Sequence, residues 1–147
     1  MGDVIMKTSR DVVGFIVKTT QAGQNGLEYV LEKPISPALR QVLRNQSALY
    51  ERLEKEALEL CANRDWQVQE LKNVSKVMSK TAAKLRLRGK DLDTRVAAMV
   101  IRGNTSGMIK GLRNLRSLPS QDPTVTGLAQ RLLDAETESI RQMKGFL

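Results

Sequence analysis

Three glycines spaced four residues apart are the feature that most constrains how this chain can fold. Gly103, Gly107 and Gly111 lie in an otherwise apolar and basic stretch, residues 95–118. Residues four apart share one face of an α-helix, so these glycines would leave that face without side chains. Glycine costs about 0.5–1 kcal/mol relative to alanine inside a helix, so three on one face indicate a close contact. We expect a neighbouring helix to pack in this groove, with methionine side chains around it.

Periodic apolar residues and clear helix starts predict an all-α protein. Hydrophobic residues make up 41% of the chain but aromatic residues only 3%, which indicates an aliphatic core and favours helix packing. Ser9, Ser36-Pro37 and Asp122-Pro123 are typical of helix starts. The expected helices cover residues 9–32, 37–63, 67–88, 92–117 and 123–146. The predicted fold class is an all-α, antiparallel four-helix bundle with an additional basic connecting helix, in a single domain over residues 1–147.

The chain contains no histidine and a single cysteine, Cys61. The absence of histidine removes the usual general base near neutral pH and excludes Ser-His-Asp triads and HExxH zinc sites. Cys61 is expected to be a small buried packing residue. We therefore predict a protein that is not an enzyme, with no cofactor and no small-molecule substrate. One cysteine, no signal peptide and no transmembrane segment favour a cytoplasmic location.

A carboxylate metal site is the one cofactor hypothesis that the sequence leaves open. Ferritin-like di-iron proteins carry Glu-x-x-His motifs on two of their bundle helices. Here the position three residues after Glu136 is Ser139, so that ligand is missing. Glu56 and Glu136 would be the ligands of any bound metal, and the alternative is that both pair with Arg or Lys.

The positive charge of the chain is concentrated in one region. The net charge is +8, whereas residues 71–117 alone carry twelve Lys or Arg against two Asp, a net of +10. Like charges four residues apart repel on a helix, so this pattern does not stabilise helix formation. Such a segment can bind nucleic acid, an anionic surface or an acidic partner, or can be a solvated face. The candidate binding residues are Lys72, Lys76, Lys80, Lys84, Arg86 and Arg88.

The C-terminal part of the chain contains a pattern that extends over its last two predicted helices. Its residues are Ala97, Met99, Gly103, Gly107, Asp122-Pro123, Glu136 and the Lys144–Leu147 tail. With this pattern the chain resembles a group of uncharacterised, ferritin-like small helical proteins from anaerobic Gram-positive bacteria, over about the last 55 residues and more loosely over the first helix pair. A more distant likeness connects Arg64-Asp65-Trp66 to ferritin-like spore-coat proteins. The first resemblance implies a ferritin-like bundle without an assigned activity.

Three functions follow as expectations. The first is a non-enzymatic structural or interaction protein that associates with itself through a flat helical face. The second is nonspecific binding of nucleic acid or an anionic surface through residues 72–90. The third is a metal-binding protein of oxidative stress, for which the expected ligands are incomplete.

Overall fold

A computed structural model describes residues 7–68, 91–118 and 122–147. This part of the chain is helical and contains no strand, which confirms the all-α prediction. Its helices are α1 (Ser9–Leu31), α2 (Pro37–Asn63), α4 (Leu92–Arg116) and α5 (Pro123–Lys144). Their ends lie within two residues of the predicted ends. None of the described helices combines the length and apolar character that a membrane crossing requires.

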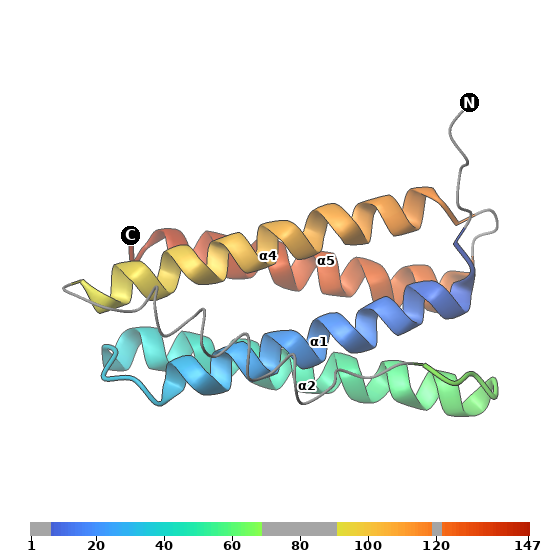
Figure 1. Ribbon diagram of the computed structural model, residues 1–147, viewed down its shortest axis with the longest axis horizontal. Coiled ribbons are helices and arrows are strands. Elements are labelled where there is room, and N and C mark those ends of the chain that lie inside the picture. The colour runs from blue at the N-terminus through green and yellow to red at the C-terminus, as the bar shows by residue number, and fades with distance from the viewer. Residues whose placement is uncertain (1–6, 69–90, 119–121) are drawn as a thin grey trace.

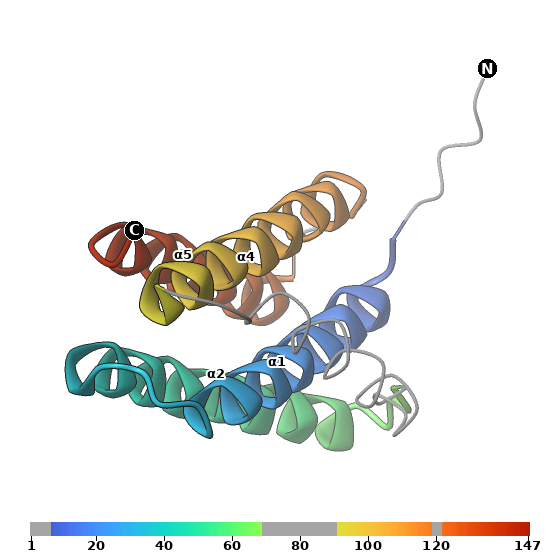
Figure 2. The same cartoon turned by 60° about the vertical axis from the view of Figure 1, so that its left-hand side comes forward.

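The helices form two layers, with α1 on α2 and α4 on α5 (Figures 1 and 2). The helices of each layer run antiparallel, but α2 and α4 run in the same direction (Figure 1). The end of α2 and the start of α4 therefore lie at opposite ends of the bundle. The predicted connecting helix over residues 67–88 lies outside the described residues except for Gln67 and Val68, which are not helical.

The helix starts follow from local capping chemistry. Thr8, not the predicted Ser9, is the N-cap of α1, because Thr8 and Asp11 form a reciprocal capping box. The Thr8 hydroxyl accepts from the Asp11 backbone N–H at 3.1 Å, and the Asp11 carboxylate accepts from the Thr8 N–H at 3.0 Å. The predicted caps Ser36 and Asp122 are confirmed, since each side chain accepts a bond from the first turn of its helix.

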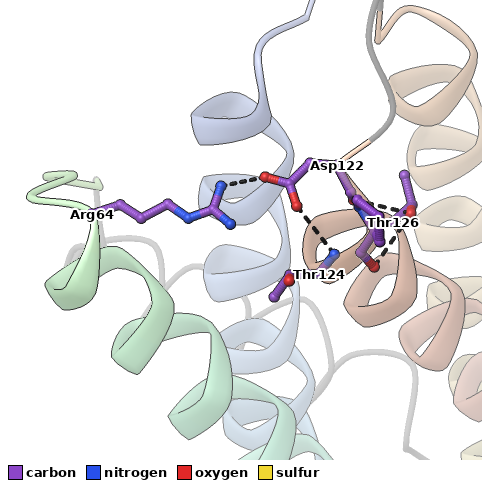
Figure 3. Close-up of polar contacts among 5 residues, drawn as sticks. Arg64, Asp122, Thr124 and Thr126 are labelled. Atoms are coloured by element: carbon purple, nitrogen blue, oxygen red, sulfur yellow. Dashed lines mark hydrogen bonds and ion pairs between the residues drawn. The ribbon is translucent and has the colours of Figure 1, made fainter.

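One end of the bundle is fastened by an ion pair between two distant segments (Figure 3). Arg64, which follows α2, donates to the carboxylate of Asp122, which caps α5. The same carboxylate accepts from the Thr124 backbone N–H at 3.1 Å. The bond from Arg64 is the main reason why the pKa of Asp122 lies below its usual value. This contact joins the two layers at the end where α2 stops and α5 starts.

The core between the layers is aliphatic, as the composition predicted. The largest completely enclosed apolar side chains are Ile16, Leu39, Leu43, Leu53 and Met143. α4 contributes least, since only three of its 25 residues are buried, whereas eight of the 22 residues of α5 are. The side of α4 that faces away from the core is therefore left for other contacts.

The three glycines of α4 have different surroundings. A Cβ at Gly107 would overlap Oε2 of Glu136, and one at Gly111 would lie 3.4 Å from Leu133 Cδ2. At Gly103 no atom lies within 4 Å of that position, and the residue is exposed. The groove prediction is therefore wrong for Gly103, because it lies outside the contact between α4 and α5. At Gly107 the space is taken by a carboxyl group.

Alanine substitutions at two of these glycines should change stability in opposite directions. Gly103→Ala should stabilise the protein by about 0.5–1 kcal/mol, because an open helical glycine is replaced by a better helix former. Gly107→Ala should destabilise it by about 1–3 kcal/mol, because the new methyl group displaces an enclosed carboxyl group. Urea denaturation of both variants measures the difference, and equal effects would contradict the close contact at Gly107.

Candidate functional site

A hydrogen-bonded chain of polar side chains crosses the centre of the bundle. The hydroxyl of Tyr50 on α2 donates to Oδ1 of Asn104 on α4 at 2.6 Å. Nδ2 of Asn104 donates to the hydroxyl of Ser139 on α5, also at 2.6 Å. All three side chains are buried, so each bond is made where water cannot replace it. Helices α2, α4 and α5 are thereby fixed in one register.

Helix α1 packs against this hydrogen-bonded chain of side chains through a glycine. A Cβ at Gly23 would lie 2.8 Å from Cε2 of the Tyr50 ring. Real Cβ atoms do not come this close to a ring carbon, so Tyr50 can lie against α1 only because residue 23 is glycine. Burial, and then the charge of Glu136, raise the pKa of Tyr50, which keeps its hydroxyl protonated and able to donate.

Glu136 lies next to the hydrogen-bonded chain and is an unusual titratable group, because it is buried without a charged partner. It is 2% exposed, and its Oε1 has no hydrogen-bond partner. Burial raises the pKa of Glu136 to about 8, because the charged form loses its hydration without gaining a cation. Near neutral pH the carboxyl group is therefore protonated. Its position opposite Gly107 makes it part of the contact between α4 and α5.

Glu56 and Glu136, the two carboxylates of the metal hypothesis, have different surroundings. Arg131 donates to both oxygens of Glu56, at 2.9 and 2.5 Å, and this pair is partly exposed. The bond from Arg131 lowers the pKa of Glu56, whereas burial raises that of Glu136. In residues 7–68, 91–118 and 122–147, no group of three or more His, Cys, Asp or Glu side chains is placed to hold a metal ion.

A basic cleft lies between the first half of α1 and the last half of α4. Its volume is about 710 Å³, which is within the range of about 300–1,000 Å³ typical of ligand pockets. Four cationic side chains line it, Lys7, Arg10, Lys18 and Lys110, against one acid, Asp11. The remaining lining residues are uncharged, and they are Thr8, Gly14, Phe15, Gln67, Val68 and Asn114. The cleft therefore offers positive charge beside a small apolar wall.

Local contacts hold two of these charged groups in place. The guanidinium of Arg10 donates to the carbonyl of Gln67 through Nε at 2.9 Å and Nη2 at 2.7 Å. The carboxylate of Asp11 is engaged in the capping box, and its bond from the Thr8 backbone N–H lowers its pKa. Lys7 is fixed at its backbone, since its N–H donates to the carbonyl of Ser117 at 3.0 Å. With four cationic side chains and one acid, the cleft has a net positive charge.

Cys61 is enclosed near the end of α2, as the sequence predicted. It is 4% exposed, and burial raises the pKa of its thiol more than the nearby Arg10 lowers it. A thiol with a raised pKa is a poor nucleophile near neutral pH. Arg64, three residues further along the chain, is paired with Asp122.

The basic residues of the cleft are not the ones that the sequence predicted to bind an anionic partner. The predicted binding residues all lie outside the described residues, and they are Lys72, Lys76, Lys80, Lys84, Arg86 and Arg88. The cleft was missed by sequence reasoning. A partial signal was available at the start of α1, because Gly14 and Lys18 fall on one face of the helix and Lys7 precedes it by two residues. Nothing in the sequence indicated that Lys110 would lie opposite them.

Comparison with known proteins supports the fold and leaves the activity open. No family model and no curated protein matches the chain. A solved structure described as a DUF305 fragment from Deinococcus radiodurans is similar, with a TM-score of 0.74 and 13% sequence identity. The alignment covers 93% of each chain. At this level of identity the likeness establishes a shared helical fold alone.

The buried carboxyl group should make the protein less stable as the pH rises. Between pH 4.5, the ordinary pKa of a glutamate, and about pH 8, the folded state holds a proton on Glu136 that the unfolded state has lost. The contribution of this group is therefore complete below the unfolded pKa and is lost as the pH approaches the folded pKa, by up to about 1.4 kcal/mol per pH unit. Urea denaturation at about pH 6 and about pH 9 measures the decline.

Two variants on α5 separate this effect from other titrations. Glu136→Gln should remove most of the decline, because the group no longer ionises. Glu138→Gln should retain it, because Glu138 is exposed and its pKa is lowered by Arg141. A decline of equal size in Glu136→Gln and the parent protein would show that the decline has another source.

Proposed function

We propose that this protein is a non-enzymatic interaction protein that binds an anionic partner through the basic cleft between α1 and α4. The observation that carries the proposal is the convergence of Lys7, Arg10, Lys18 and Lys110 on one cavity with a single acid. Clefts lined by one sign of charge raise the local concentration of the oppositely charged partner and speed its association. The net charge of +8 adds a long-range attraction of the same sign.

The proposed scaffold is a ferritin-like bundle. Support comes from the common direction of α2 and α4, which requires a connection between opposite ends of the bundle (Figure 1). One long connection of this kind is typical of ferritin-like folds. The buried layer contains a phenol, an amide, a hydroxyl and one carboxyl group. Such a layer suits a role in holding the helices together, and the partner then binds at the surface.

Nonspecific binding of nucleic acid or an anionic surface is the second candidate. It is favoured by the net charge of +10 over residues 71–117, part of which lies on α4 beside the cleft. Self-association and a cytoplasmic location remain predictions from the sequence. A metal-binding role has less support, because Glu56 is already bound by Arg131.

A binding titration with fluorescent polyglutamate tests the leading proposal. We expect the affinity to fall steeply between about 50 and about 200 mM salt, as electrostatic binding requires. Lys110→Glu should weaken binding at low salt by about fivefold or more, because it reverses a charge inside the cleft. Lys55→Glu is the matched control, since it makes the same change at an exposed position of α2.

Three outcomes would contradict the proposal. Binding that does not respond to salt would exclude an electrostatic site. Equal losses in Lys110→Glu and Lys55→Glu would show that only net charge matters. A single-stranded oligonucleotide of random sequence that binds far more tightly than polyglutamate would favour the second candidate.

A further inference from the structure

The outward side of α4 carries two exposed apolar side chains among basic ones. Ile109 is 48% exposed and Leu112 is 41% exposed, and Leu147 is the other large apolar residue with comparable exposure in the described chain. Arg102, Arg113 and Arg116 are exposed at positions that share this side of the helix. These five residues are called the α4 outer face below. Figures 1 and 2 show α4 at the edge of the bundle, in the layer opposite α1 and α2.

The burial pattern of α4 leaves this face without a partner inside the described bundle. The buried residues of the helix are Val96, Ala97 and Asn104, and all three precede Ile109. In the last part of the helix, Gly111 marks the inward side, because a Cβ there would lie 3.4 Å from Leu133 and 3.6 Å from Phe15. Ile109, Arg113 and Arg116 are related by steps of four and three, so they form a continuous stripe on the other side.

The positive charge of the α4 outer face limits which kinds of partner could bind to it. No acidic residue occurs between Asp93 and Asp122 in the sequence. A second copy bound face to face would bring arginines against arginines, which is unfavourable. A nucleic-acid backbone would satisfy the arginines but would leave Ile109 and Leu112 without an apolar contact. An amphipathic helix with acidic flanks satisfies both kinds of side chain.

We propose that the α4 outer face is a docking surface for an acidic amphipathic helix of a partner protein. This inference rests on the proposed function, because it specifies the chemistry of the anionic partner. Apolar residues of the partner, spaced three and four apart, would pack on Ile109 and Leu112 as in other helix-mediated contacts. Its carboxylates would pair with Arg102, Arg113 and Arg116, where planar guanidinium groups favour two-bond contacts. Lys110, at the edge of the cleft, extends the same positive surface.

The test compares two synthetic peptides of equal composition and charge on the full chain. One places leucine at helical spacing with glutamate elsewhere, and the other scrambles the order to destroy the apolar stripe. We expect the amphipathic peptide to bind about tenfold more tightly, because only this peptide buries apolar area together with its charges. Polyglutamate is the third probe, and it reports the electrostatic contribution alone.

Alanine variants assign the binding to the face. The double variant Ile109→Ala, Leu112→Ala should lose the preference for the amphipathic peptide and keep its affinity for polyglutamate. Leu147→Ala is the control, because it removes an exposed apolar side chain that lies outside the α4 outer face. It should bind both peptides as the parent protein does. Thermal melts verify that each variant is folded, which is expected because the altered side chains are exposed.

The outcomes distinguish this inference from the proposed function. Equal binding of both peptides, with polyglutamate binding intact, overturns the docking surface alone. If neither peptide nor polyglutamate binds the parent protein, both proposals are wrong. Sedimentation that shows a dimer abolished by the double alanine variant would assign the face to a second copy. Binding to anionic vesicles that needs Ile109 and Leu112, without peptide binding, would assign it to a membrane surface.

Discussion

The fit of two large polar side chains against two glycines is the constraint on which the rest of the bundle depends. The ring of Tyr50 lies where it would overlap a Cβ at residue 23, and the carboxyl group of Glu136 lies where it would overlap a Cβ at residue 107. Enclosed polar groups tolerate little displacement, since a lost hydrogen bond leaves a partner unsatisfied. The bonds through Asn104 therefore fix how α4 lies on the other helices.

The protonated state of Glu136 belongs to the same constraint. A charged carboxylate in this position would need a cation, and burial alone determines its pKa. Near neutral pH the group is neutral and acts as a large polar packing residue. In contrast, Glu56 and Asp122 remain charged, because each is bound by an arginine near the surface. The ion pairs hold elements together at the periphery, and the neutral polar layer holds them together at the centre.

Charge and exposure divide the bundle into two sides with different roles. The layer of α1 and α2 supplies much of the aliphatic core, whereas α4 buries few residues and presents basic and apolar side chains outward. The cleft arises where the start of α1 meets the end of α4, and the α4 outer face is next to it. A helix that packs on α5 along one side and leaves its other side exposed is suited to contact a partner.

The sequence by itself determined the helices, because their caps, prolines and apolar periodicity are local signals. Ser36 and Asp122 cap the helices that they were expected to cap, and the bounds of α2 were predicted to the residue. Tertiary structure decided what each helical face meets. Three equally spaced glycines are equivalent in the sequence, yet one is open to solvent, one faces Leu133 and one faces Glu136. Likewise, the opposition of Lys110 to Lys7 and Lys18 depends on the packing of α4 against α1, which no local pattern encodes.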